Sequence, residues 1–162
     1  MSDKHEPFSK NYDKEQQKHY EREVRLEHGP DLVNQSVQNW NSYSEAEKEN
    51  IMEEGNQIYR DFVKAIEANK RHDSKEVTEI LERWHQHIRY FYEPNIDLLR
   101  GLGMTYNTNP DFIANFQKMH EDLPAFLEQA IGYYVDELET AELERMLADD
   151  EAMHQRQSRL SS

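Results

Sequence analysis

Apolar residues recur at intervals of three and four along the middle of the chain, which is the pattern of amphipathic helices. The first stripe consists of Ile51, Gly55, Ile58, Phe62 and Ile66. Ser44 and Glu47 stand before it with the spacing of a capping box, in which each residue bonds the backbone of the other. The pattern therefore predicts a helix that begins after Ser44 and runs to about Asn69.

A second stripe follows a polar break and consists of Val77, Leu81, Trp84, Ile88 and Phe91. We expect Asp73 to cap this helix, because an aspartate oxygen accepts from the first turn of a helix. Pro94 is expected to stop or kink it, since the proline ring clashes with the preceding turn.

Shorter helices are expected after Pro94. One runs from about Asn95 to Leu102 and is ended by Gly101 and Gly103. Asn109 precedes Pro110, and this pair predicts the start of another helix, since proline suits the first helical turn. A last long helix opens at Pro124, and no strand-length alternation is present, so the fold class is all-α.

The two ends of the chain carry few apolar positions. Residues 1–38 are predicted to be a weakly ordered segment, in which Tyr20 and Val24 form the clearest apolar pair. Residues 39–148 are predicted to be the packed helical domain. The last helix is expected to fray near Asp149 and to leave residues 149–162 as a disordered tail.

Composition excludes several classes of protein. The 162 residues carry 19 Lys and Arg against 33 Asp and Glu, a net charge of −14, which argues against direct binding of nucleic acid or of an anionic membrane. The longest apolar run, Ala130–Val135, is far shorter than the ~18 residues of a membrane span. With no visible signal sequence, we expect a cytoplasmic protein.

No pattern in the chain favours an enzyme. Glu82-x-x-His85 and Glu151-x-x-His154 have the spacing of a carboxylate-bundle metal site, but 22 glutamates and eight histidines produce about one such pair by chance. Zero cysteines exclude disulfides and thiol nucleophiles, and no phosphate-binding glycine loop occurs. We therefore expect no catalytic residues, no bound metal and no cofactor.

Aromatic residues are the outstanding chemical feature. Successive aromatic residues on a helix face different directions, so Tyr90, Phe91 and Tyr92 cannot all point into a core. Tyrosine and tryptophan side chains combine an apolar ring with a polar group that can stay in contact with water, and such side chains line clefts for large amphiphilic ligands. For Tyr92 and Tyr134 the core and the cleft are equally good interpretations.

Several segments together resemble one known family. They are, in order, Tyr20-x-x-Glu23-Val24, Gly29, Ser36, His87-Ile88-x-x-Phe91-Tyr92, Arg100-Gly101-Leu102, Tyr106-x-x-x-Pro110-x-Phe112-x-x-Asn115-Phe116 and the helix Leu123–Tyr134. This ordered set, over about residues 20–138, resembles the TipAS antibiotic-recognition domain. The resemblance implies a globin-like helical fold without haem and an N-terminal segment that becomes ordered with ligand.

The family's cleft, as the resemblance implies, is lined by the helices that carry Trp84–Tyr92, Leu98–Tyr106 and Phe112–Phe116. The predicted ligand-binding residues are Trp84, His87, Ile88, Phe91, Tyr92, Arg100, Met104, Tyr106, Phe112, Phe116 and Tyr134. Of these, His87 and Arg100 would be the polar anchors, and the walls would be Trp84, Ile88, Phe91, Tyr92, Met104, Tyr106 and Tyr134. The predicted function is binding of a bulky, partly apolar antibiotic or related metabolite, for drug sensing or sequestration.

The chain departs from the family in two respects. The family's thiopeptide sensors capture their ligand through a cysteine just after the Phe-Tyr pair, where this chain has Glu93-Pro94, so binding is expected to be non-covalent. The family is often the effector half of MerR-type transcriptional regulators, and we expect this chain to act without a DNA-binding half before Tyr20. The alternatives are a protein-interaction module, which includes a homodimer, and an effector-domain fragment of a MerR-type regulator.

Overall fold

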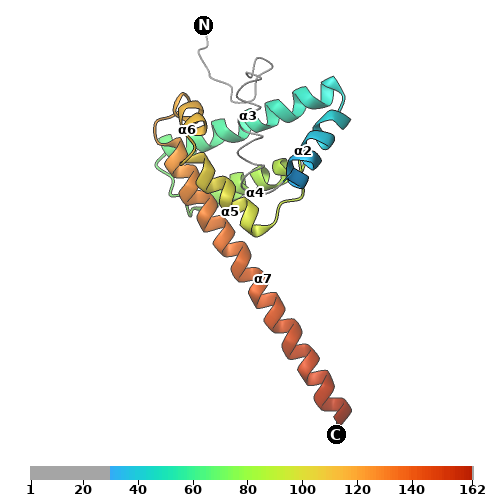
Figure 1. The fold of residues 1–162 in the computed structure, drawn as a ribbon. Coiled ribbons are helices and arrows are strands. Elements are labelled where there is room, and N and C mark those ends of the chain that lie inside the picture. The colour runs from blue at the N-terminus through green and yellow to red at the C-terminus, as the bar shows by residue number, and fades with distance from the viewer. Residues whose placement is uncertain (1–29, 162) are drawn as a thin grey trace.

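The computed structural model describes residues 30–161, and all regular secondary structure in this part of the chain is helical (Figure 1). The helices are α2 (Pro30–Ser42), α3 (Glu45–Glu67), α4 (Lys75–Ile88), α5 (Ile96–Tyr106), α6 (Pro110–Gln117) and α7 (Leu123–Ser161). The all-α prediction is confirmed. The apolar pair Tyr20 and Val24 lies outside the described residues.

Helix α3 begins as its sequence predicts. The Ser44 hydroxyl accepts from the Glu47 amide at 3.1 Å, and the Ser44 amide donates to the Glu47 carboxylate at 2.8 Å. The helix ends at Glu67, shortly before Asn69, whose φ of 58° lies in the left-handed region. Asn69 therefore turns the chain into the short connection to α4.

Helix α4 differs from expectation at both ends. Its cap is Ser74, whose hydroxyl accepts from the Val77 amide, while the carboxylate of Asp73 binds Arg71. It ends at Ile88, well before Pro94. In the next turn, residues 89–92, the carbonyls of Tyr90 and Phe91 accept from the side chains of Tyr43 and Asn39. A longer helix could not bond the Tyr90 carbonyl, because Pro94 has no N–H to donate.

Helix α5 runs through both glycines that were expected to end it. A Cβ at Gly103 would lie 2.8 Å from Cγ2 of Ile131, so this glycine lets α5 approach α7 closely. The prediction that Gly101 and Gly103 terminate the helix is wrong, because Gly103 is used for packing between helices. The start of α6 is as predicted, with Asn109 as the cap and Pro110 in the first turn.

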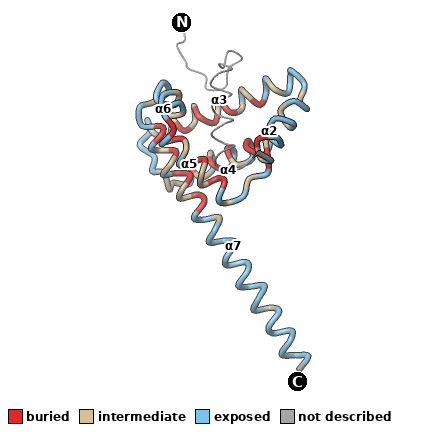
Figure 2. The backbone as a smooth tube through the Cα atoms, viewed as in Figure 1, coloured by how far each residue is buried: buried red, intermediate tan, exposed pale blue. Residues whose placement is uncertain are grey.

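The core lies where α3, α4, α5 and α6 surround the first part of α7, and buried residues concentrate there (Figure 2). Its largest fully buried side chains are Trp84, Phe62, Phe116, Ile58, Leu81, Leu99, Leu123, Leu127 and Ile131. Burying such apolar surface is the main stabilising contribution to a helical domain of this size.

Helix α7 continues far beyond the core (Figures 1 and 2). We call its projecting part, residues 139–161, the arm. The structure differs here from the expected disordered tail: the helix reaches Ser161, with Arg145 paired to Glu142 and Asp149 one turn away on either side. The expected boundaries at residues 38 and 148 both fall inside helices, and the division of the chain into three parts stays a prediction.

Candidate ligand-binding site

A groove of about 520 Å³ lies along α4, between parts of α3 and α7. It is lined by Glu54, Glu79, Glu82, Arg83, Gln86 and Tyr134. Glu54 comes from α3 and Tyr134 from α7, while the other four residues project from the charged face of α4. The amphipathic pattern of α4 thus places its apolar side in the core and its polar side in the groove.

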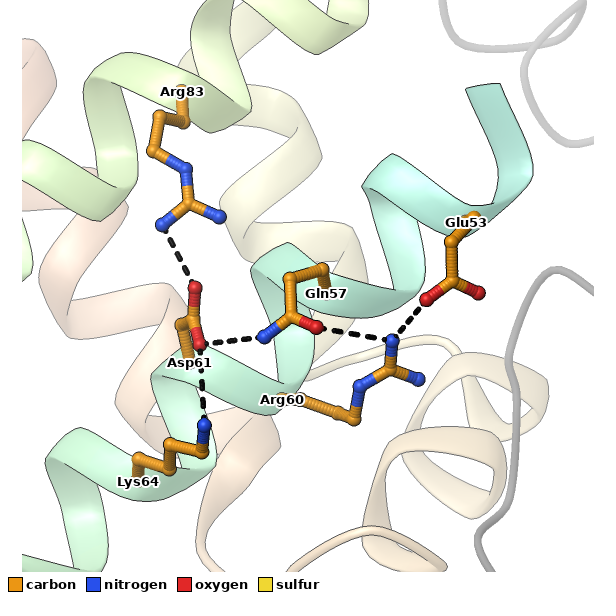
Figure 3. A network of polar contacts seen from close by, with 6 residues as sticks. All are labelled: Glu53, Gln57, Arg60, Asp61, Lys64 and Arg83. Atoms are coloured by element: carbon orange, nitrogen blue, oxygen red, sulfur yellow. Dashed lines mark hydrogen bonds and ion pairs between the residues drawn. The ribbon is translucent and has the colours of Figure 1, made fainter. Parts of the chain in front are cut away.

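The groove carries an excess of negative charge. Three of its residues are glutamates and one is an arginine. That arginine, Arg83, donates to Asp61 on α3 at 2.8 Å, and Asp61 also accepts from Gln57 at 2.9 Å. Figure 3 shows how this network continues through Arg60 to Glu53. The cation of the groove is therefore engaged by α3, and the lining favours a ligand with cationic or hydrogen-donating groups.

His85 and Tyr134 make a polar contact at the edge of the groove. His85 Nδ1 lies 2.9 Å from the Tyr134 hydroxyl, with the two rings edge to face. Burial lowers the pKa of His85, and the charge of Arg89 lowers it further. Burial also raises the pKa of Tyr134. Near neutral pH both groups are uncharged, so they offer a ligand hydrogen bonds and an aromatic surface.

Glu54 links the groove to the turn that follows α4. Its carboxylate lies 3.4 Å from His87 Nδ1 and accepts from the Tyr90 hydroxyl at 3.2 Å. Burial lowers the pKa of His87, and the neighbouring carboxylate of Glu54 acts in the opposite direction. One glutamate therefore lines the groove and contacts both His87, in the last turn of α4, and Tyr90, in the turn that follows.

The end of α2 is fixed to the same turn. Asn39 donates to the Phe91 carbonyl at 2.7 Å, and the Tyr43 hydroxyl donates to the Tyr90 carbonyl at 2.6 Å. Trp40 stacks on Phe91 with ring centroids 5.8 Å apart, and the ammonium group of Lys48 lies 5.6 Å from the centroid of the Trp40 ring. This small aromatic cluster couples α2 to the end of α4.

A second aromatic cluster fills the body of the domain. Tyr106 is at its centre, with Tyr59, Trp84, Phe112 and Phe116 at centroid distances between 5.2 and 6.5 Å. The hydroxyls of Tyr59 and Tyr106 lie 3.3 Å apart. Burial raises the pKa of Tyr106, so its hydroxyl stays protonated and can donate within the apolar interior.

The structure places the eleven predicted ligand-binding residues in four settings. Tyr134 lines the groove, and His87 lies beside the groove residue Glu54. Buried in the core are Trp84, Ile88, Tyr92, Tyr106 and Phe116, and packed against it, half-buried, are Phe91 and Phe112. Met104 is 55% exposed, and Arg100 binds Asp136 and Glu139 at 2.8 and 3.1 Å on the surface. Their role as ligand contacts stays a prediction.

Sequence reasoning missed five of the six groove residues. They occupy the charged face of α4 and one position of α3, and periodicity assigns such positions to solvent. Glu82 was noticed only as part of Glu82-x-x-His85. Within residues 30–161 no group of three or more His, Cys, Asp or Glu side chains is arranged to hold a metal ion. No helix in this range is long and apolar enough to cross a bilayer.

The fold and its helical interior are those of an antibiotic-recognition domain. Residues 20–134 match the family model of the TipAS antibiotic-recognition domain, and the chain belongs to this family. The resemblance read from the ordered motifs is thereby confirmed, together with the globin-like helical fold that it implied.

Two individual proteins are similar to this chain. The structure of TipAS from Streptomyces lividans in complex with nosiheptide has a TM-score of 0.68 and 27% identity, over 82% of this chain and 91% of that chain. The HTH-type transcriptional activator mta of Bacillus subtilis (strain 168) is 33% identical over 128 residues, which are 77% of this chain and 48% of the activator. The chain therefore matches about half the length of this regulator.

Proposed function

We propose that this protein binds a bulky, partly apolar antibiotic or related metabolite without forming a covalent bond, and so senses or sequesters it. The observation that carries the proposal is the shared fold with TipAS, a protein solved in complex with the thiopeptide antibiotic nosiheptide. The family match over residues 20–134 supports the same class of ligand. The proposal is for binding and not for catalysis.

The non-covalent character follows from composition. The chain contains no cysteine, and Glu93 and Pro94 follow the Phe-Tyr pair. Neither side chain is a nucleophile that adds to a dehydroamino acid, the electrophile of a thiopeptide. Affinity must therefore come from aromatic and apolar contact, with a few polar groups that fix orientation.

The preferred ligand is neutral or cationic. The net charge of −14 and the excess of carboxylates in the groove both disfavour an anion. A ligand with an amine or several amide donors would match Glu79, Glu82 and the Tyr134 hydroxyl.

Tryptophan fluorescence tests the proposal directly. Trp40 stacks at the end of α2 and Trp84 lies in the core, so ligand contact or movement of either region changes the emission. We expect saturable quenching or a spectral shift with at least one member of a panel of thiopeptide and other peptide antibiotics. Trp40→Phe leaves Trp84 as the single reporter and shows which region responds. Silence across the panel, with no change in the proton NMR spectrum, would overturn the proposal.

A charge variant tests the site. Glu82→Gln is expected to weaken a cationic ligand by about threefold to tenfold, because one groove carboxylate is lost, and to leave a neutral ligand unaffected. Glu144→Gln on the arm removes the same charge from a position outside the groove and is the matched control. Equal losses of ligand affinity in both variants would show that only the overall charge of the protein matters.

A second candidate function is the effector part of a transcriptional regulator. The similarity to the activator mta favours it. In that case the ligand would change the interaction of this domain with a DNA-binding partner. The genes encoded beside this one distinguish the two functions, because an efflux pump or an antibiotic cluster would be controlled by a regulator.

A further inference from the structure

The arm of α7 carries an exposed apolar surface outside the candidate groove. It lies beyond residue 134, where the family match ends, and it projects away from the core (Figure 1). Within the described residues, five of the seven large hydrophobic side chains that are exposed belong to it. They are Leu143, Met146, Leu147, Met153 and Leu160, each more than half exposed. A helix with such side chains in water is typical of an interaction surface.

These residues lie on one side of the helix. Met146, Met153 and Leu160 recur every seven residues, and Leu143 stands three residues before Met146. These positions fit a coiled-coil seam, whose layers alternate at intervals of three and four, with the other two seam positions occupied by Asp150 and Gln157. We refer to Leu143, Met146, Met153 and Leu160 as the seam. Its ends, Leu143 and Leu160, are 17 positions apart, so it is roughly 26 Å long at about 1.5 Å per residue.

Charge is divided unequally along the arm. Residues 139–151 contain six carboxylates and one arginine, whereas residues 152–161 contain two arginines and no carboxylate. Two parallel arms would set acidic segment against acidic segment. In an antiparallel pair, Arg156 and Arg159 of each copy lie against the acidic start of the other, which includes Glu142 and Glu144.

We propose that the arm pairs with the arm of a second copy of this chain, as a short antiparallel coiled coil. In this pairing Leu143 lies against Leu160 of the second copy, while Met146 and Met153 lie against Gln157 and Asp150 of the second copy. The charge pattern makes the second copy the fitting occupant, because each arm carries both halves of the complementary charge. This association is independent of the antibiotic site, so either proposal can fail without the other.

Two polar residues limit the strength of the pairing. Asp150 and Gln157 share the seam's side of the helix, seven and fourteen residues after Leu143, and would face Met153 and Met146 of the second copy. A carboxylate at such a position costs stability but specifies register, as polar residues in coiled-coil seams do. We therefore expect a reversible dimer.

Sedimentation equilibrium of the full chain provides the first test. The wild-type protein is expected to be a reversible dimer with a micromolar dissociation constant, weakened by salt. Met153→Glu should weaken dimerisation by at least about tenfold, because it buries a charge in the seam. Gln155→Glu is the matched control: it adds the same charge about 200° round the helix, away from the seam, and should have little effect.

A variant that strengthens the dimer tests the proposal in a way that misfolding cannot mimic. Asp150→Leu should tighten the dimer by about tenfold or more, since an apolar residue replaces the charge in the seam. A protein that stays monomeric at high micromolar concentration in all of these forms, with its arm exposed or held by another partner, would overturn the proposal. A dimer that Met153→Glu does not weaken would overturn it as well.

Cross-linking tests orientation. Because the chain has no cysteine, Leu143→Cys and Leu160→Cys each introduce a single thiol. On oxidation, an antiparallel pair joins Leu143→Cys chains to Leu160→Cys chains in a mixture and leaves each variant alone unlinked. Disulfides within one variant, or none in the mixture, would contradict the antiparallel arrangement.

Discussion

The body of the domain and the arm are both helical, but different interactions hold them. Leu99 in α5 is 1% exposed and packs in the core, whereas Leu147 in the arm is 68% exposed. The arm depends on local backbone bonds and on pairs such as Arg145 with Glu142 and Asp149, whereas the body depends on tertiary burial. The family match ends at residue 134, next to the last fully buried residue, Val135. The family match therefore includes the part of α7 that is buried in the core and excludes the exposed arm.

A leucine-to-alanine substitution should change the free energy of unfolding much more in the body than in the arm, and this is the largest expected difference between the two regions. Leu99→Ala is expected to lower the free energy of unfolding by about 2–5 kcal/mol, because it leaves a cavity in the core. Leu147→Ala should change it by less than about 0.5 kcal/mol at concentrations where the protein is monomeric. Urea denaturation followed by circular dichroism measures both. Similar losses would mean that the arm packs on the body in solution.

Two glycines allow a comparison between a tightly packed position and a position with free space beside it. Gly103→Ala places a methyl group 2.8 Å from Ile131 Cγ2 and should destabilise the domain by about 1–3 kcal/mol. Gly132→Ala meets no atom within 4 Å and should stabilise it by about 0.5–1 kcal/mol, through higher helix propensity. Thermal unfolding of the two variants tests this, and a stabilising Gly103→Ala would contradict the close approach of α5 and α7.

Acid should destabilise the body through His87. Because burial lowers its pKa, the unfolded chain binds a proton more readily than the folded one. Its stabilising contribution is complete above the unfolded pKa of about 6.5 and is lost as the pH falls below that value toward the folded pKa. His87→Gln should flatten this part of the profile of unfolding free energy against pH, by no more than about 1.4 kcal/mol per pH unit.

His154→Gln provides the control for that profile, because it removes a histidine from the exposed arm. Urea unfolding at about pH 7.5 and about pH 5.5 measures the slopes. If the His87→Gln protein keeps the wild-type slope, His87 does not carry the effect.

The hydrogen bond that helps to hold α2 against the turn after α4 is expected to have the smallest effect on stability. Tyr43→Phe removes the hydroxyl that donates to the Tyr90 carbonyl and should weaken the docking of α2 by about 1 kcal/mol. Hydrogen exchange of the α2 amides should accelerate, while that of the core helices stays unchanged. Gln38→Ala, an exposed change within α2, should leave the exchange rates as they were. Unchanged exchange in Tyr43→Phe would mean that the hydroxyl contributes little.

The elements of the fold could be predicted where the signal is local. The Ser44 capping box, the Asn109 cap and the stripes of α3 and α4 follow from neighbours in sequence, and all are present. The role of Gly103 could not be predicted, because it depends on Ile131, a distant residue that meets it only in the folded domain. The turn after α4 depends in the same way on Asn39 and Tyr43, which are distant in sequence.

The candidate site was harder to predict than the fold. Aromatic content indicated an amphiphilic ligand, and Tyr134 does line the groove, but Trp84 and Tyr106 are buried among core residues. Charged residues such as Glu79 and Glu82 have the periodicity of a solvated helix face. Their proximity to Tyr134 arises from the packing of α4 against α7, which sequence spacing does not encode.

The most direct test of antibiotic binding is a titration of ¹⁵N-labelled protein with a thiopeptide, followed by two-dimensional NMR. We expect saturable shifts of body resonances, centred on the helix α4, Trp40 and Tyr134, while resonances of the arm stay in place. A spectrum that does not change with this or any other peptide antibiotic of the panel would contradict the proposed function.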